Sequence, residues 1–238
     1  MKTPHPQQAQ IAPLPTHVAI IMDGNARWAG QRHLSRLEGH RIGTDNIRRA
    51  VETFAEYGIQ YLTLYAFSTE NWKRPKAEVN GLMRILNRVI RSEVNNLHQK
   101  GIQIRHLGRL DRLSTRVQQE IQRAIDLTKD NDKMVLSIAF DYGGRAEIVN
   151  AVKTIVEQGV PAESIDESSF SSYLYSNGLP DPDLIIRTAG EMRLSNFLLW
   201  QSAYSEFYFS PVSWPEFDEE AIKQALLAYS KRERKFGG

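Results

Sequence analysis

Short apolar runs alternate along this chain with longer segments in which apolar residues recur every three or four positions. The runs are rich in β-branched and aromatic residues, which predicts strands at residues 17–22, 61–67, 102–107, 134–140, 183–187 and 207–209. The longer segments predict helices near residues 40–57, 76–100, 112–129, 144–158 and 216–234. Alternating strands and helices, with nearly continuous apolar character in the first four strands, are typical of a parallel sheet covered on both faces. We therefore predict an α/β fold, a single domain with a central, mostly parallel six-stranded sheet flanked by helices.

The longest predicted helix, residues 76–100, carries one continuous apolar stripe. Its members are Val79, Leu82, Met83, Leu86, Val89, Ile90, Val94 and Leu97. Gly101 follows as a residue able to end the helix. The stripe fits ordinary core packing, and it fits equally well one wall of an apolar tunnel, with Leu136 and Ile138 of the fourth strand as further wall candidates. The pattern alone leaves both interpretations open.

The first sixteen residues differ from the rest of the chain, because they hold four of its ten prolines. We expect residues 1–16 to be a disordered, proline-rich lead-in and residues 17–238 to form the folded domain. The lead-in has no apolar segment of the kind found in a signal peptide. No apolar run in the sequence approaches the ~20 residues that a membrane-spanning helix needs.

Composition narrows the possible chemistry. Lysine and arginine number 30 against 28 acidic residues, and the formal net charge of +2 argues against binding nucleic acid through a basic surface. The absence of cysteine excludes disulfides, thiolate metal sites and a cysteine nucleophile. The chain also lacks the sequence patterns of the P-loop, the zinc peptidases and the serine hydrolases.

The end of the first predicted strand carries candidate chemistry. Ligands of open α/β sheets bind beyond the carboxyl ends of the strands. Here that end is Asp23 and Gly24, followed by exposed amides and Arg27 at the expected start of a helix. The carboxylate suits a hard cation such as Mg²⁺, and the amides and guanidinium suit phosphate. A plain turn built from Asp and Gly explains this segment about as well.

Two further strand ends add cations. The second strand is followed by Trp72 and Arg74, an aromatic wall beside a positive charge. The fifth strand leads to Arg187 and Arg193, whose planar guanidinium groups suit multidentate binding of phosphate, and Glu206 precedes the last strand. The arginines gathered in this way are Arg27, Arg36, Arg74, Arg187 and Arg193. We predict that these arginines converge at one edge of the sheet with Asp23 and Glu206, the two candidate metal ligands. Such a site would hold two polyanionic groups bridged by a divalent ion.

Five long motifs together resemble one family. They are MDGNARWA at residues 22–29, GHRIG at 39–43, FSTENWKRPKAEV at 67–79, DLIIRTAGEMRLSNFLLWQSAYSE at 183–206 and RERKFGG at 232–238. In this order and spacing the chain resembles the cis-prenyltransferases, most closely the bacterial undecaprenyl diphosphate synthases, over residues 17–238. Two positions depart from the usual pattern, namely Ala26, where the family often has Gly, and Asp141, where it often has Asn. The absence of a DDxxD pair separates the chain from the trans-prenyl synthases.

The resemblance implies a transferase that condenses isopentenyl diphosphate repeatedly onto an allylic primer, usually farnesyl diphosphate, and forms each new double bond in cis. The implied product is a long-chain polyprenyl diphosphate, namely undecaprenyl diphosphate for the lipid carrier of cell-wall synthesis. The family also implies Mg²⁺ as cofactor, a homodimer, and a cytoplasmic protein that contacts the inner face of the membrane transiently to deliver its product. It implies no nucleic-acid partner.

The same resemblance assigns roles to individual residues. Asp23 and Glu206 would bind Mg²⁺, and Asp23, Ser68 and Asn71 would be catalytic, the last two by accepting or relaying a proton. Substrate binding would involve Gly24, Asn25, Ala26, Arg27, Trp28, Arg36, His40, Ser68, Thr69, Glu70, Trp72, Arg74, Arg187, Arg193, Leu194 and Ser195. Within this set, the first two motifs would hold the allylic diphosphate and the fourth would hold isopentenyl diphosphate.

Three alternatives stay open. A short- or medium-chain cis-prenyl diphosphate synthase would share every motif, because the tunnel and not the motifs sets product length. A non-catalytic partner subunit of the same fold would lack the catalytic Asp and the arginines, which are present here. A nucleic-acid binder would use Arg84, Arg88 and Arg91 together with residues 231–235, but the near-helical spacing of the first three indicates a solvated helix face.

Overall fold

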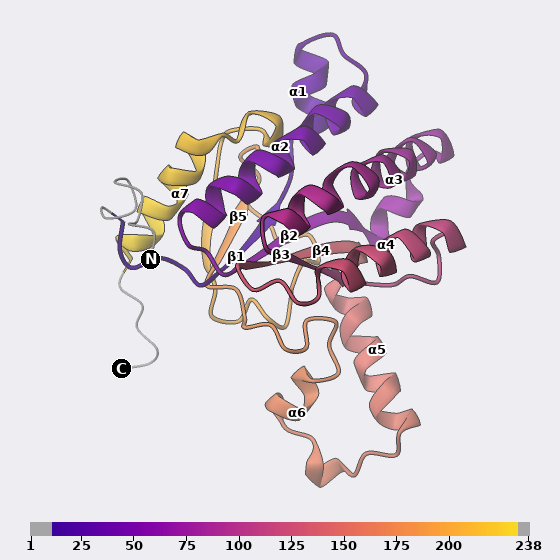
Figure 1. Ribbon diagram of the computed structural model, residues 1–238. Helices are drawn as coiled ribbons and strands as arrows, with labels where there is room; N and C mark the ends of the chain where they lie inside the picture. The colour runs from indigo at the N-terminus through magenta and orange to yellow at the C-terminus, as the bar shows by residue number, and fades with distance from the viewer. Residues whose placement is uncertain (1–10, 233–238) are drawn as a thin grey trace.

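Six strands form one sheet in the order β3-β4-β2-β1-β5-β6, and every neighbouring pair is parallel (Figure 1). The computed structural model describes residues 11–232. The strands are β1 (His17–Ile21), β2 (Tyr61–Ser68), β3 (Ile102–Leu107), β4 (Met134–Tyr142), β5 (Leu184–Arg187) and β6 (Glu206–Phe209). The predicted α/β domain with six strands is confirmed, and the sheet is parallel throughout.

The five predicted helices are present, and two short helices join them. The long ones are α2 (Arg36–Glu56), α3 (Lys76–Gln99), α4 (Thr115–Thr128), α5 (Gly144–Glu157) and α7 (Glu219–Ser230). The predicted last helix extended to residues 233 and 234, which lie outside the described residues. The short elements are the helices α1 (Asn25–Gln31) and α6 (Glu167–Ser171) and the 3₁₀ turns η2 (Thr69–Lys73), η3 (Ala162–Ser164) and η4 (Trp214–Glu216). Among the helices of residues 11–232, none is both long and apolar enough to span a membrane.

Helix α2 starts four residues earlier than predicted because its first turn is largely polar. Its start is set by Ser35, whose hydroxyl accepts a hydrogen bond from Glu38 N at 3.2 Å. This side-chain cap satisfies one of the backbone N–H groups that the first turn leaves unpaired. The apolar repeat becomes visible only after this turn, which explains the late prediction.

The side chains of β1 show how the sheet is covered on both faces. Val18 and Ile20 belong to the core shared with α2 and α7, whereas Ala19 and Ile21 belong to a second cluster with Phe197. Helices α7, α2, α3 and α4 lie side by side over the first face (Figure 1). All six strands end at one edge of this covered sheet, which we call the carboxyl edge.

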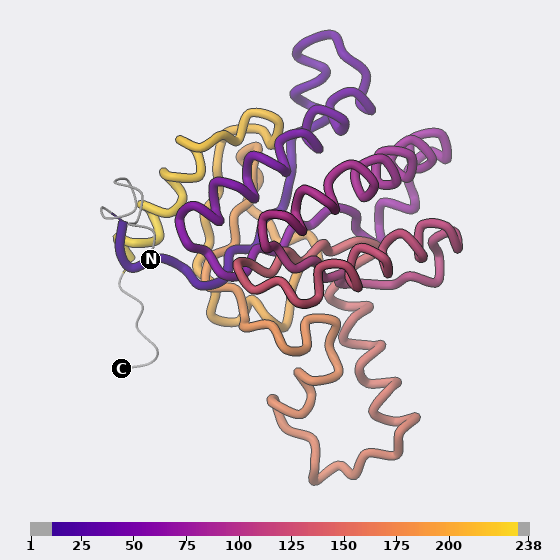
Figure 2. The backbone as a smooth tube through the Cα atoms, viewed as in Figure 1, coloured from indigo at the N-terminus to yellow at the C-terminus, as the bar shows by residue number. Residues whose placement is uncertain are grey.

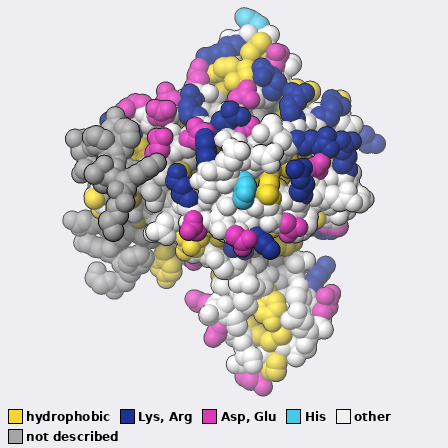
Figure 3. All heavy atoms as spheres, viewed as in Figure 1, with side chains coloured by type: hydrophobic (Ala, Val, Ile, Leu, Met, Phe, Trp, Pro, Cys, Tyr) yellow, Lys and Arg dark blue, Asp and Glu magenta, His cyan; other side chains and the backbone are white. Residues whose placement is uncertain are grey.

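Helices α5 and α6 extend from the body of the molecule as a separate lobe (Figure 2). On α5, Val149, Val152 and Val156 are 54%, 47% and 72% exposed. Their spacing of three and four residues places them on one face of the helix. The space-filling view shows hydrophobic side chains gathered on this lobe (Figure 3). The lobe therefore presents an unpartnered apolar face to solvent.

Residues 11–16 are packed onto the domain. Ile11 is only 3% exposed and belongs to the core shared with α2 and α7. Thr16 donates from its backbone N to Asp183 Oδ2 at 2.8 Å, and its carbonyl accepts from Tyr61 N at 3.1 Å. The predicted disordered lead-in is therefore wrong for residues 11–16, because apolar side chains between the prolines reach the core. Residues 1–10 lie outside the described residues.

Candidate active site

Asp23 and Arg187 meet at the carboxyl edge, where β1 and β5 end side by side. Arg187 is only 4% exposed, and it donates from Nη2 to Asp23 Oδ2 at 2.7 Å and from Nη1 to Ser195 Oγ at 2.6 Å. Its Nε is buried and has no hydrogen-bond partner among the described residues. A buried donor without a partner costs free energy, so this N–H is well suited to an anionic ligand oxygen.

Backbone contacts hold Asp23 in this position. The hydroxyl of Thr188, a fully buried residue, accepts a hydrogen bond from Asp23 N at 2.8 Å and donates one to Asp23 O at 2.7 Å. The next residue, Gly24, has a φ of 99°, and a Cβ on it would lie 2.8 Å from the Cβ of Ala189. Glycine is therefore required by the left-handed turn and by the close approach of the loop after β5.

Helix α1 carries the rest of the first motif, with Asn25, Ala26, Arg27 and Trp28 in its first turn. It packs tightly on α2, since a Cβ at Gly43 would lie 2.1 Å from Asn25 Oδ1. Asn25 Oδ1 and Trp28 Nε1 are both buried without a partner among the described residues. The motif thus brings two further unpaired polar atoms close to the carboxyl edge.

Glu191 joins two of the predicted substrate-binding arginines. Its carboxylate accepts a hydrogen bond from Arg27 Nη2 at 2.6 Å and pairs with Arg193 Nη1. Hydrogen bonds from Arg27 and then from Arg193 hold the pKa of Glu191 below its ordinary value. Both arginine side chains are more than half exposed, which leaves their other N–H groups open to a ligand.

The loop after β5 adopts an unusual backbone. Ala189, Ser195, Asn196 and Leu198 have φ values of 67°, 50°, 66° and 44°, in the left-handed region that favours glycine. Each such residue costs of order 1 kcal/mol and persists only where surrounding contacts enforce it. One of these contacts is the bond from Gly144 N to Asn196 O at 2.7 Å. Strain of this kind concentrates at binding sites, where it holds a loop in one conformation.

A second group of cations lies where α2 approaches the start of α3. Arg74 and Arg36 both reach the carboxylate of Glu78, at 2.9 Å and 4.0 Å. The side chain of His40 is largely buried near them, and its Nε2 has no partner among the described residues. Burial and then the charge of Arg74 lower the pKa of His40 to about 4, so the imidazole is neutral at pH 7. An anion bound at this point would contact the two guanidinium groups beside the unpaired ring nitrogen of His40.

The turn after β2 is organised by Asn71. Its Oδ1 accepts a hydrogen bond from Ser68 N at 3.0 Å, and the two residues form a capping box around η2. Thr69 donates to one oxygen of Glu70 at 3.2 Å, and Asn196 Nδ2 donates to the other at 2.8 Å. Asn196 thereby connects this turn to the loop after β5. Residues that follow β2 therefore lie at the same site as those that follow β5.

Trp72 is held in place by Asp141 and Arg112. Asp141 is fully buried and accepts hydrogen bonds from Trp72 Nε1 and Arg112 Nε, both at 2.8 Å. The Arg112 guanidinium also lies 5.4 Å from the centre of the Trp72 ring. Asp141 has a φ of 50°, which Asp and Asn tolerate better than most residues. This backbone explains how an Asp can stand where an Asn is frequent.

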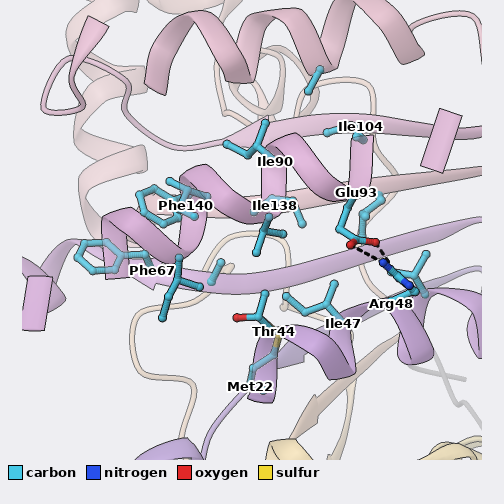
Figure 4. Close-up of a pocket in the computed structure, with 18 of the residues that line it drawn as sticks. Met22, Thr44, Ile47, Arg48, Phe67, Ile90, Glu93, Ile104, Ile138 and Phe140 are labelled. Carbon is cyan, nitrogen blue, oxygen red and sulfur yellow. Dashed lines mark hydrogen bonds and ion pairs between the residues drawn. The ribbon is translucent and has the colours of Figure 1, made fainter. Parts of the chain in front are cut away.

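An apolar cavity begins beside these groups and continues between the sheet and helices α2 and α3 (Figure 4). Met22, Asn25 and His40 line it near the carboxyl edge, and Leu97 and Ile104 line it at depth. Polar and apolar parts of the site are therefore continuous. A ligand with a charged head and a long apolar tail fits this arrangement.

The predicted stripe on α3 divides between this cavity and the core. The six stripe residues that line the cavity are Leu82, Leu86, Val89, Ile90, Val94 and Leu97. Leu136 and Ile138 of β4 line it as well, as the tunnel interpretation predicts. Val79 and Met83 do not line it and pack in a cluster with α4, which Leu82, Leu86 and Ile90 also contact. The stripe therefore takes part in core packing and also lines a cavity, and the tunnel stays a prediction.

Glu206 does not lie at the carboxyl edge. It is the first residue of β6 and pairs in register with Leu184, three residues before Arg187. At about 3.3 Å per residue, roughly 10 Å of strand separates it from the level of Arg187. Its carboxylate pairs with Arg232 instead. The prediction that Glu206 converges with Asp23 on one metal is wrong within a single chain, because the first residue of a parallel strand lies toward the opposite edge from a residue that follows one.

Asp23 is the remaining metal candidate among the predicted residues. Within residues 11–232, no cluster of three or more His, Cys, Asp or Glu side chains could hold an ion. The Asp23 side chain is 34% exposed, and its two oxygens accept one hydrogen bond each, from Gly24 N and from Arg187. Each oxygen keeps a second acceptor position open. Mg²⁺ commonly binds one or two carboxylates together with substrate phosphates, so Asp23 fits a metal site that the substrate completes.

Sequence reasoning missed several residues that organise the site. They are Arg112, Thr188, Glu191 and Asn196. The last three lie inside the fourth motif, which is the signal that could have found them, whereas Arg112 lies outside every motif. Leu194, a predicted substrate-binding residue, packs against the cluster that contains Ile21.

The comparison with known proteins agrees with this geometry. The model of the undecaprenyl diphosphate synthase family matches residues 21–237. An isoprenyl transferase of Clostridium perfringens is 49% identical over 229 residues, covering 94% of this chain and 90% of the relative. One of Fusobacterium nucleatum is 52% identical over 225 residues, covering 94% and 96%.

Solved structures are similar over nearly the whole chain. The lavandulyl diphosphate synthase of Lavandula x intermedia, solved in complex with dimethylallyl diphosphate, superposes with a TM-score of 0.91 at 41% identity. The match covers 94% of this chain and 99% of that one. A probable undecaprenyl diphosphate synthase of Campylobacter jejuni gives a TM-score of 0.80 at 33% identity, over 96% and 100% of the chains.

Proposed function

The chain belongs to the undecaprenyl diphosphate synthase family of prenyltransferases, and we propose that it condenses isopentenyl diphosphate repeatedly onto an allylic diphosphate. The proposed primer is farnesyl diphosphate, and the proposed product is undecaprenyl diphosphate, a lipid carrier for cell-wall synthesis. One observation carries the proposal: an edge rich in arginine leads directly into an apolar cavity. A diphosphate head and a growing prenyl chain require that combination.

The allylic diphosphate is proposed to bind beside Asp23. The cluster of Arg36, Arg74 and His40, whose Nε2 is unpaired among the described residues, lies around this position. Fixed cations stabilise the negative charge that develops as the diphosphate leaves, and they do so without reorganising. Since Asn25 and His40 also line the cavity, the apolar tail would extend into it.

Isopentenyl diphosphate is proposed to bind at Arg187, Arg193 and Ser195. The contacts of Arg187 with Asp23 and Ser195 hold its guanidinium in one orientation, with an unpaired Nε. The carboxylate of Glu191 similarly restrains Arg193. Holding the two reactants in register on adjacent strand ends would remove much of the entropic cost of the bimolecular reaction.

In the proposed step, the bond between C1 and the diphosphate oxygen of the allylic substrate breaks, and C4 of isopentenyl diphosphate bonds to C1. A proton leaves C2 of isopentenyl diphosphate, and Ser68 and Asn71 are proposed to accept or relay it. Both residues belong to the turn that Asn196 attaches to the loop after β5. Phe67 and Trp72 pack edge to face nearby, 5.2 Å between ring centres, and would exclude water from the electron-deficient carbon.

Mg²⁺ is the proposed cofactor, held by Asp23 together with diphosphate oxygens of the substrate. When bound, the ion would stabilise the charge on the departing diphosphate. Asp23 has the open acceptor positions that this role requires, and Glu206 has no part in the same site within one chain.

A homodimer is the proposed assembly. The exposed valines of α5 form the kind of apolar face that marks an association surface. Sedimentation velocity should show a dimer for the wild type and a monomer for Val149→Glu/Val156→Glu. A dimer in both proteins would move the proposed interface away from α5.

The proposed location is the cytoplasm, with transient contact at the inner face of the membrane. The two substrates are charged and water-soluble, whereas a product with a long apolar chain partitions into lipid. Delivery of that product is the proposed reason for the membrane contact.

A shorter product is the second candidate. The similar lavandulyl diphosphate synthase was solved with dimethylallyl diphosphate, a much smaller allylic substrate. The depth of the cavity, which continues along α3 as far as Leu97, favours the long-chain product.

Purified protein incubated with farnesyl diphosphate, Mg²⁺ and radiolabelled isopentenyl diphosphate tests the proposal. The expected result is a ladder of (Z)-polyprenyl diphosphates ending near the undecaprenyl product. Termination after a few additions would support the short-chain candidate. Lack of incorporation with every allylic primer would contradict the proposed function.

A further inference from the structure

Two charged side chains form part of the wall of the apolar cavity. Arg48 of α2 donates from Nε to Glu93 Oε2 at 2.9 Å and from Nη2 to Glu93 Oε1 at 2.6 Å. This two-point ion pair connects α2 to α3 (Figure 4). Guanidinium and carboxylate groups paired in this way have a defined relative geometry, which a single contact would not impose.

The ion pair separates the cavity from an outer groove. Arg48 and Glu93 line both spaces, and so do Thr44, Ile85 and Val89. On the outer side the groove is completed by further polar residues, namely Arg41, Asp45, Arg88 and Ser92. At this level the same side chains of α2 and α3 therefore line both the cavity and the groove.

The position of the pair along the cavity is deep. Figure 4 shows Phe67 and Phe140 at one end of the cavity and the Arg48–Glu93 pair toward the other. On α3 the lining runs from Leu82 to Leu97, roughly 22 Å at 1.5 Å per residue, and Glu93 lies about three-quarters of the way along it. A chain that grows from the carboxyl edge reaches the pair before it reaches the end of the lining.

We propose that Arg48 and Glu93 form the side wall that determines how far the product can grow. The inference rests on the proposed function, since it assumes that the prenyl chain extends into this cavity. With the wall intact, a growing chain is confined to the part of the cavity that extends beyond the pair to Leu97. With the wall removed, the chain end passes sideways between α2 and α3 into the outer groove, and elongation continues.

The pair contributes little to the stability of the fold, which makes the proposal testable by substitution. The Arg48 side chain is 54% exposed and that of Glu93 is 20% exposed. Partly exposed ion pairs of this kind have small effects on folding. Arg91 and Glu120 form a comparable pair between α3 and α4, at 3.0 and 2.8 Å, and neither lines the cavity. That pair is the matched control.

The experiment measures product length with farnesyl diphosphate and labelled isopentenyl diphosphate. Arg48→Ala/Glu93→Ala should shift the final products to lengths greater by one or more isoprene units and broaden the distribution. Arg48→Leu/Glu93→Leu removes the charges but keeps bulky side chains in the wall, so the products should have the wild-type length. Arg91→Ala/Glu120→Ala should keep that length too.

An unchanged or shortened distribution in the alanine pair variant, with turnover retained, would overturn the inference. Lengthening in the leucine pair variant would also overturn it, because the wall would then not be the cause. Failure of the wild type to elongate any primer would instead contradict the proposed function. The two failures are therefore distinguishable in one assay.

Discussion

The carboxyl edge and the cavity beneath it are built in different ways. At the edge, each cation has a specific partner: Asp23 orients Arg187, and Glu191 restrains Arg27 and Arg193. The cavity is lined mainly by aliphatic side chains that contact one another without directional bonds. The edge therefore depends on the identity and geometry of single groups, whereas the cavity depends on volume. We expect changes at the edge to alter rate, and changes in the cavity to alter product length.

The largest effect is expected from Asp23→Ala. This change removes the proposed metal ligand and the partner of the buried Arg187, so kcat should fall roughly 10²- to 10³-fold, the size seen when one preorganised charge-stabilising group is lost. Asp23→Asn keeps the size of the side chain but only one of its two acceptor oxygens and no charge, so it should be nearly as impaired. Steady-state kinetics in Mg²⁺ measure both variants, with urea unfolding as a control. Near-normal turnover of either variant would remove Asp23 from the metal site.

The second-largest effect is expected from a change at the junction between the carboxyl edge and the cavity. Arg112→Ala leaves the fully buried carboxylate of Asp141 without its charge partner, and the free energy of unfolding should fall by about 3 kcal/mol. Adding Asp141→Asn should restore most of this loss, because the buried charge is then absent. Urea denaturation measures both variants. Full stability in the single variant would mean that the pair does not hold Trp72 in place.

A smaller effect is expected when the cavity is filled. Ile138 lines the cavity, and Ile138→Phe places a larger side chain in the space that the growing chain would occupy. Products should become shorter, while the KM for isopentenyl diphosphate stays near the wild-type value. Product sizing and initial-rate kinetics on one preparation provide the measurement. A changed KM with unchanged product length would reverse the assignment of the two regions.

The smallest effect concerns two histidines with similar pKa values. Burial lowers the pKa of both His40 and His17 to about 4, but only His40 lies among arginines with an unpaired Nε2. Mg²⁺-pyrophosphate bound at the edge should raise the pKa of His40 toward its ordinary value and leave His17 unchanged. Since binding then takes up a proton, affinity should increase as the pH falls from 6.5 toward 4. Imidazole NMR titrations with and without pyrophosphate measure this. Equal responses of the two histidines would contradict an anion site beside His40.

The fold was largely predictable because its signals are local. Within residues 11–232, apolar runs and helical repeats located every strand and every long helix, since those elements bury continuous faces. The exceptions have physical causes. Helix α1 is too short for a repeat, and Ile11 reaches the core from a segment whose prolines suggest disorder.

The site was predictable only as far as strand ends reveal it. Residues that follow a parallel strand, such as Asp23 and Arg187, meet at one edge by topology alone. Glu206 begins its strand, and the same topology places it toward the other edge. The roles of Arg112 and Asn196 depend on the conformation of loops, which no periodicity in the sequence specifies.

A crystal structure with Mg²⁺ and a non-hydrolysable farnesyl thiodiphosphate tests the division between edge and cavity most directly. We expect the diphosphate to bind beside Asp23, with the tail lying along α3 past Leu86 and Val89 toward the Arg48–Glu93 pair. Two results would contradict this division. One is a diphosphate beside Asp23 with its tail outside the cavity, and the other is a tail inside the cavity with its diphosphate bound elsewhere.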